Sequence, residues 1–126
     1  MGNNGKKVII IEDDEHISRI YEMKLAKEGL STVVVRDGER AITIVAQEKP
    51  DIIVLDIMIP KKDGFEVIKE IKQNPDTAGI PIIILSNLGQ KSYQDRALAL
   101  GATEYLVKVN YPIQEVVAKI KGYLSP

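Results

Sequence analysis

The sequence predicts an α/β domain in which five parallel strands alternate with five helices. Five short runs of apolar, mostly β-branched residues recur along the chain. Each run is followed by a segment with apolar residues at helical spacing, and turn-forming residues separate the units. This alternation is typical of a parallel sheet with helices on both faces. The 126 residues suffice for one domain, expected at 6–124 after a disordered tail at 1–5.

The five expected strands lack the alternation of polar and apolar residues that marks a half-exposed strand. Continuous apolar runs of this length are typical of strands buried on both faces. The strands are expected at residues 8–11, 32–35, 52–55, 82–85 and 105–107.

The first three expected helices each carry an apolar face at spacings of three and four residues. Gly29 supplies a stop for the first helix, Asp37 is suited to cap the second, and Pro75 breaks the third. The three faces are Ile17, Ile20, Tyr21 and Leu25; Ala41, Ile42, Val45 and Ala46; and Phe65, Ile68 and Ile71.

The last two helices differ in the regularity of their patterns. The fourth has Tyr93, Ala97 and Leu100 at spacings of four and three residues, and Gly101 follows. The fifth begins just after Pro112, a residue favoured at helix starts. Its apolar stripe is the clearest of the five and consists of Ile113, Val116, Val117, Ile120 and Leu124.

Five strands in one doubly wound domain are compatible with a flavodoxin-like sheet of strand order 2-1-3-4-5. Ligands of such sheets bind beyond the carboxyl ends of the strands, at the switch point between the first and third strands. Chemically capable residues follow four strands of this sequence. They are Glu12 and Asp13 after the first strand, Asp56 after the third, Ser86 after the fourth and Lys108 after the fifth.

These side chains suit a metal-assisted phosphoryl-transfer site. Three carboxylates repel one another unless a cation intervenes, and Mg²⁺ prefers oxygen ligands. Mg²⁺, Lys108 and the Ser86 hydroxyl could stabilise an incoming phosphoryl group. Asp56 is the better candidate for the nucleophile because it ends the central strand, whereas Glu12 and Asp13 are adjacent and suit metal ligation.

These candidate site residues lie in four short sequence motifs. They are Ile11-Glu12-Asp13-Asp14-Glu15, Asp56-Ile57-Met58-Ile59-Pro60 with Asp63-Gly64, Leu85-Ser86 and Tyr105-Leu106-Val107-Lys108. In this order and spacing, the chain from Lys6 to Leu124 resembles the receiver domains of bacterial two-component response regulators. Each motif alone is weak, but the set is specific.

The resemblance implies a phosphoacceptor and a metal site. Asp56 would accept the phosphoryl group in the presence of Mg²⁺, with Mn²⁺ as a plausible substitute. Asp13 would ligate the metal directly and Glu12 would do so through water. Asp56 itself and the backbone carbonyl of Met58 would complete the protein ligands.

The resemblance also implies a switch. Ser86 would contact the phosphoryl group, and Lys108 would pair with Asp56 or its phosphate. As Ser86 is drawn inward, the space it leaves could admit the ring of Tyr105, the family's aromatic switch residue. Tyr105 could also be a simple core aromatic.

These roles predict a phosphoacceptor domain of a phosphorelay and not an enzyme with external turnover. The donor would be a phosphohistidine of a sensor histidine kinase or phosphotransfer protein, or a small acyl phosphate. A downstream protein target would read the face of the fourth helix, fifth strand and fifth helix, in the cytoplasm. The alternative is a receiver-like scaffold that binds proteins without being phosphorylated.

Other classes that use a similar fold or chemistry fit less well. A flavodoxin-like cofactor binder needs a phosphate-binding loop after the first strand, where this chain has four acidic residues, 12–15. A haloacid-dehalogenase-like phosphatase needs a second carboxylate at the position of Met58. Both classes are therefore disfavoured.

Two residues depart from the pattern of the family. Asn87 stands where a very small residue is usual, which leaves the phosphorylation and dephosphorylation rates open. Val109 stands where the family has a cis proline, and a cis bond to a non-proline residue costs about 2.5–4 kcal/mol. We nevertheless expect Lys108 to reach Asp56, because the charge balance requires it.

Composition argues against several other partners and sites. The formal net charge of -1 gives no electrostatic reason to bind nucleic acid or an anionic membrane directly. The sequence contains no cysteine and one histidine, His16, which excludes thiolate sites and argues against an imidazole zinc site. The apolar runs are far shorter than the ~20 residues that span a bilayer.

Overall fold

The computed structural model describes residues 5–125, which form five strands and five α-helices in alternation. The strands are β1 (Lys7–Ile11), β2 (Ser31–Val35), β3 (Ile52–Leu55), β4 (Ile82–Ser86) and β5 (Glu104–Val107). The helices are α1 (Glu15–Lys27), α2 (Gly38–Glu48), α3 (Gly64–Gln73), α4 (Lys91–Ala99) and α5 (Ile113–Leu124), with a 3₁₀ turn, η1 (Lys108–Asn110), before α5. Residues 1–4 of the predicted disordered tail lie outside the described residues.

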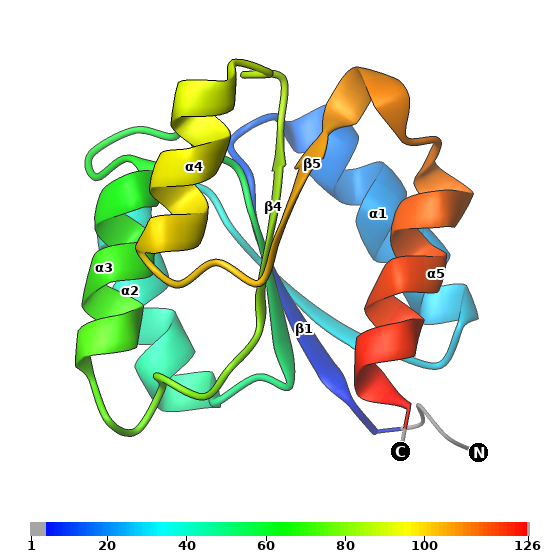
Figure 1. Cartoon of the computed structure of the whole chain (residues 1–126). Coiled ribbons are helices and arrows are strands. Elements are labelled where there is room, and N and C mark those ends of the chain that lie inside the picture. The colour runs from blue at the N-terminus through cyan, green and yellow to red at the C-terminus, as the bar shows by residue number, and fades with distance from the viewer. Residues whose placement is uncertain (1–4, 126) are drawn as a thin grey trace.

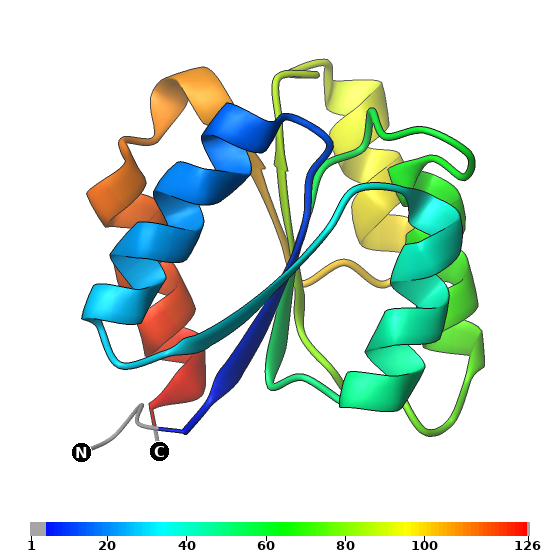
Figure 2. The same ribbon diagram turned by 180° about the vertical axis from the view of Figure 1, so that it is seen from behind.

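The strands form one parallel sheet of order β2-β1-β3-β4-β5, as predicted. Helices α1 and α5 cover one face of the sheet, and α2, α3 and α4 cover the other (Figure 1). The view from behind shows the same three layers (Figure 2). No helix within residues 5–125 is long and apolar enough to cross a membrane.

The core consists of two apolar layers, one on each side of the sheet. Ile9 and Ile53 pack on the side of α2, α3 and α4, whereas their neighbours Val8 and Ile52 pack on the side of α1 and α5. All four are fully buried, and burial of a side chain of this size contributes about 1.5–3 kcal/mol. Burial on both faces explains why the strand sequences do not alternate.

Two residues of the predicted helix faces are exposed. Ile20 is 39% exposed, because α1 contacts the sheet along the line of Tyr21 and Leu25 and Ile20 lies at its edge. In α2, Ala46 is exposed, and Ile44 packs against the core instead. In both helices the buried stripe is shifted relative to the one predicted.

The helix starts at the carboxyl end of the sheet use two designs. Asp14, Asp37 and Asp63 cap α1, α2 and α3, each accepting a hydrogen bond from a backbone N–H three residues further on. Such caps stabilise a helix by about 1 kcal/mol. The residues before α4 and α5, Gln90 and Pro112, make no side-chain capping bond.

Two glycines hold the loop between β3 and α3 in place. A Cβ on Gly38 would lie 1.9 Å from the carbonyl oxygen of Lys62, and a Cβ on Gly64 would lie 2.6 Å from the Cα of Ile57. The Gly38 N–H also donates to the Pro60 carbonyl at 3.1 Å. Because the starts of α2 and α3 contact this loop so closely, it has little freedom to move.

Candidate functional site

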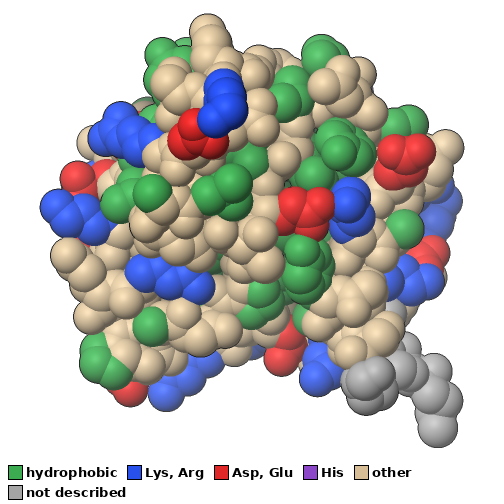
Figure 3. Space-filling view, viewed as in Figure 1, with side chains coloured by type: hydrophobic (Ala, Val, Ile, Leu, Met, Phe, Trp, Pro, Cys, Tyr) green, Lys and Arg blue, Asp and Glu red, His purple; other side chains and the backbone are tan. Residues whose placement is uncertain are grey.

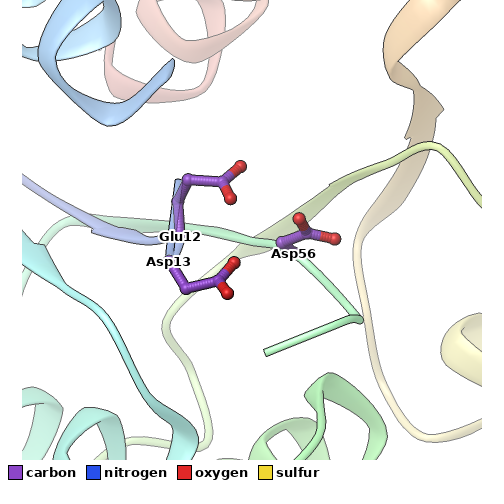
Figure 4. A group of neighbouring side chains, drawn as sticks. All are labelled: Glu12, Asp13 and Asp56. Carbon is purple, nitrogen blue, oxygen red and sulfur yellow. The ribbon is translucent and has the colours of Figure 1, made fainter. Parts of the chain in front are cut away.

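Three carboxylates meet where the neighbouring strands β1 and β3 end. The N–H of Asp56 donates to the Ile11 carbonyl at 3.0 Å and holds the two segments side by side. The carboxylates of Glu12 and Asp13 turn to the side on which Asp56 lies (Figure 4), and one oxygen of each residue lies within 4.8 Å of the other two. An all-oxygen donor set of this kind fits a hard divalent cation.

The Lys108 ammonium lies between two of these carboxylates. Its Nζ is 2.7 Å from Glu12 Oε1 and 3.1 Å from Asp56 Oδ2. The side chains of Lys108, Glu12 and Asp56 are 15%, 6% and 10% exposed, so water screens these ion pairs weakly. The contact with Asp56 follows from the charge balance. The shorter contact with Glu12 was not predicted, although one lysine among three carboxylates indicates shared pairing.

Lys108 reaches the site without a cis peptide bond at Val109. All peptide bonds of the described residues are trans. The chain turns through η1 instead, and the Tyr111 N–H closes this turn on the Lys108 carbonyl at 3.2 Å. Val109 is 82% exposed and leaves the lysine free to point inward.

Burial and ion pairing act in opposite directions on the charged groups. Burial raises the pKa of Glu12, and hydrogen bonds from Lys108 and the Asp14 N–H offset this only in part. Burial would lower the pKa of Lys108, but the hydrogen bond to Glu12 and the charge of Asp56 outweigh it, so the pKa is raised. With one ammonium and three ionised carboxylates, the site carries a formal charge of -2. A divalent cation would balance it.

Both oxygens of Asp56 have protein partners. The Met58 N–H donates to Oδ1 at 3.2 Å, and Lys108 donates to Oδ2. Met58 follows Asp56 in the loop held by the two glycines, and its side chain is exposed. Its backbone therefore lies beside the carboxylate, where a carbonyl ligand was predicted.

Ser86 and Tyr105 are connected through one residue of the β4–α4 loop, Leu88. The Leu88 N–H donates to Ser86 Oγ at 3.2 Å, and the Tyr105 hydroxyl donates to the Leu88 carbonyl at 2.6 Å. Tyr105 is buried, and burial raises the pKa of its hydroxyl. Its ring thus lies in the interior, between β5 and the β4–α4 loop. Sequence reasoning missed Leu88, which acts through backbone atoms that any residue supplies.

Asn87 lies next to Ser86 and is exposed. Its side chain is therefore open to solvent at the end of β4. The role predicted for it, a contact with the phosphoryl group or a hydrolytic water, stays a prediction.

Comparison with known proteins gives matches over nearly the whole chain. The family model described as the response regulator receiver domain matches residues 8–121. A curated relative, the "Probable transcriptional regulator ycf27" of Cyanophora paradoxa, is 40% identical over 121 residues, 96% of this chain and 49% of the relative. The chain thus spans about half the length of the curated relatives it matches.

Solved structures agree with this match. The BeF3-activated N-terminal receiver domain of Klebsiella pneumoniae RstA is 30% identical, with a TM-score of 0.87 over 94% of this chain and 98% of that chain. The Mn²⁺-bound form of the response regulator Rcp1 is also 30% identical, with a TM-score of 0.79 over 93% and 90%. With the predicted sheet order and the family model in agreement, this chain belongs to the receiver domains of two-component response regulators.

Proposed function

We propose that this domain accepts a phosphoryl group on Asp56. An oxygen of the Asp56 carboxylate attacks the phosphorus atom of a phosphohistidine on a sensor kinase or phosphotransfer protein, or of a small acyl phosphate. A new O–P bond forms, and the P–N or P–O bond to the donor breaks. The imidazole leaves with the electron pair of the P–N bond and is neutral because its other ring nitrogen carries a proton, whereas an acyl donor leaves as a carboxylate.

The observation that carries this proposal is the convergence of three carboxylates and one buried lysine on the carboxyl ends of neighbouring strands. Glu12, Asp13 and Asp56, with the Met58 carbonyl, would hold Mg²⁺ or Mn²⁺. When bound, the metal neutralises charge on the phosphoryl oxygens. The described Mn²⁺ form of Rcp1, 30% identical to this chain, supports the assignment.

The protein's own residues have three tasks in this step. The Met58 N–H fixes one oxygen of Asp56 and so orients the carboxylate. Lys108, already 3.1 Å from the other oxygen, would follow the charge as it spreads onto the phosphoryl group. Ser86 is almost fully buried and would donate its hydroxyl hydrogen to a phosphoryl oxygen.

The output would be a change in the face formed by α4, β5 and α5. The hydrogen bonds of Leu88 to Ser86 and Tyr105 give the phosphoryl group a short route to that face. Figure 3 shows acidic, basic and hydrophobic side chains interspersed there, which suits a protein partner better than a polyanion. We propose that a cytoplasmic protein target reads this face, and that the domain catalyses only its own phosphorylation and dephosphorylation.

A receiver-like scaffold that works without phosphorylation is the second candidate. Asn87 and Val109 favour it, because they depart from the family pattern directly after Ser86 and Lys108.

One assay distinguishes the two candidates. The protein is incubated with Mg²⁺ and acetyl phosphate and its intact mass is followed over time, with Asp56→Ala as control. We expect a gain of one phosphoryl group in the natural sequence, no gain in Asp56→Ala, and a strongly slowed gain in Lys108→Ala. The absence of a gain in the natural sequence would favour the scaffold.

A further inference from the structure

The loop between β3 and α3 contains two consecutive three-residue turns. The Ile59 N–H donates to the Ile57 carbonyl at 3.1 Å, and the Lys62 N–H donates to the Pro60 carbonyl at 2.9 Å. The second turn has Lys61 at its centre, with a φ of 71°. A φ of about +75° at the central residue is typical of the classic γ-turn, which is rare and strained.

The side chain of Lys61 does not account for this conformation. It is exposed, and among the described residues it takes part in no ion pair. Lysine also lacks the short polar group with which Asn and Asp bond locally in the left-handed region. Because such strain persists only where the surrounding structure imposes it, its cause lies in the neighbouring backbone.

The residues on both sides of Lys61 are held by other parts of the protein. The Pro60 carbonyl accepts a second hydrogen bond, from the Gly38 N–H at 3.1 Å. The Lys62 carbonyl lies so close to Gly38 that a Cβ there would be 1.9 Å away, and the Lys62 ammonium pairs with Glu70 at 2.7 Å. Because Pro60 is bound to α2 and Lys62 to both α2 and α3, the backbone of Lys61 must turn between two fixed points.

The first turn carries a contact with Asp56. Met58 is its central residue, and the Met58 N–H donates to Asp56 Oδ1 at 3.2 Å. Only Ile59 and Pro60 separate Met58 from Lys61. Pro60 cannot absorb a rotation, because its ring fixes φ at about −65°. A change of conformation at Lys61 would therefore shift the first turn, and with it the N–H that orients Asp56.

We propose that Lys61 is a positioning residue of the site around Asp56 and acts through its backbone. Its left-handed conformation keeps the Pro60 carbonyl on Gly38 while the Met58 N–H stays on Asp56. This role rests on the proposed function, since it concerns the carboxylate that would attack the phosphoryl group. The Lys61 side chain has no part in it.

Three substitutions separate the backbone of Lys61 from its side chain. Lys61→Ala removes the ammonium and leaves the backbone preference similar, and Lys61→Gly permits the conformation without strain. Lys61→Val opposes the conformation, because a β-branched residue is an outlier at positive φ. We expect only Lys61→Val to break the contact between Met58 and Asp56.

Lys49→Val is the matched control. Lys49 is the other non-glycine residue of the described chain with a positive φ, 45°, and its side chain is also exposed. It lies before β3, whereas Lys61 lies after it, so the two are at opposite ends of this strand. Both valine substitutions should lower the urea midpoint, but only Lys61→Val should change the surroundings of Asp56.

The first readout is the amide signal of Met58 in the unphosphorylated, metal-free protein. The sequence has three methionines, so isotopic nitrogen in methionine gives at most three amide signals, and Met58→Leu identifies the signal of Met58. We expect Lys61→Val to shift this signal and to speed its exchange with water, because the hydrogen bond to Asp56 is lost. Lys61→Ala and Lys49→Val should leave it in place.

The second readout is the rate of phosphorylation by acetyl phosphate with saturating Mg²⁺. We expect Lys61→Val to be slower by about tenfold, the effect of losing one hydrogen bond to a charged group, and Lys49→Val to match the natural sequence. An unchanged Met58 signal or an unchanged rate in Lys61→Val overturns the proposal. An equal shift in Lys49→Val also overturns it, because the effect would then come from general destabilisation.

Two further outcomes keep the test decisive. If Lys61→Val does not fold, the urea midpoints of Lys61→Gly and Lys61→Ala decide: the first should be higher, and a lower one would show that Lys61 is not strained. If the natural sequence gains no phosphoryl group, the proposed function fails, while the Met58 signal still shows whether Lys61 orients the Asp56 carboxylate.

Discussion

Helices α3 and α4 cover the same face of the sheet but are attached to it very differently. Five residues of α3 are buried, and Asp63 caps its start. Only Ala97 is buried in α4, and Gln90 provides no side-chain cap. The helix nearer to the loop of Asp56, α3, is thus anchored, and the helix beside Tyr105, α4, is held weakly.

The contacts between these helices are also limited. The ring of Phe65 stacks on Tyr93 with centroids 6.1 Å apart, and the Arg96 guanidinium lies 4.1 Å from the centre of the Phe65 ring. Cation–π contacts at exposed sites contribute only about 0.5–1 kcal/mol. The loop after β3 is held by close contacts with the starts of α2 and α3, so we expect the geometry of Asp56 to depend more on these helices than on α4.

The difference in packing between α3 and α4 should be largest for substitutions on the buried face of α3. Ile68→Ala should lower the free energy of unfolding by about 2–5 kcal/mol, because Ile68 is fully buried and leaves a cavity. Leu98→Ala in α4 should change it by less than about 0.5 kcal/mol, because Leu98 is 45% exposed. Urea unfolding measures both. Equal losses would show that α4 is as firmly packed as α3.

The glycine at the start of α3 is the next test. Gly64→Ala should destabilise the protein by about 1–3 kcal/mol, because its methyl group would press on Ile57 and the Asp56 carbonyl. Gly122→Ala in α5 is the control: nothing lies within 4 Å of its Cβ, and alanine should add about 0.5–1 kcal/mol. A neutral Gly64→Ala would mean that the loop yields more easily than its contacts indicate.

Removing the cap of α3 and adding one to α4 should make the stabilities of the two helices more similar. Asp63→Ala removes the bond to the Glu66 N–H and should cost about 1 kcal/mol. Gln90→Asp offers α4 a cap and should slow amide hydrogen exchange in its first turn. If exchange in α4 stays as fast as before, the lack of a cap is not what keeps this helix weakly held.

The smallest expected effect concerns pH and the β5–α5 edge. Lys119 and Tyr123 donate to Glu104 at 2.7 and 2.6 Å and lower its pKa from the ordinary 4.5. Because the folded pKa lies below the unfolded one, this stabilisation is present above pH 4.5 and disappears as the pH falls through the folded pKa. At pH 7 the urea midpoint of the natural protein should therefore be slightly higher than that of Glu104→Gln, and the difference should shrink as the pH is lowered below 4.5. A difference that grows as the pH falls would refute this sign.

The sheet could be predicted closely because burial on both faces leaves a continuous apolar run in the sequence. Every strand lies within one residue of its predicted bounds at each end. The helix faces were less certain, because the periodicity of α1 does not say which edge of the stripe meets the sheet. Ile20 and Ala46 are the residues for which this ambiguity gave the wrong result.

For the site, the sequence identified the residues but not how their side chains pair. The residues at the strand ends could be found because parallel strands bring their carboxyl ends to one edge. The pairing of Lys108 with Glu12 and the inward ring of Tyr105 depend on side-chain conformations. The link through Leu88 uses only backbone atoms, which no sequence pattern marks.

The position of Lys108 between Glu12 and Asp56 also has a consequence for folding equilibria. Its ammonium cancels one of three negative charges, so the folded site keeps an excess of negative charge. In the unfolded chain these carboxylates are not held close together. A cation that binds this site and not the unfolded chain adds to stability by mass action. The melting temperature should then rise with the logarithm of free Mg²⁺, which makes a thermal scan a measure of metal occupancy before any phosphate is added.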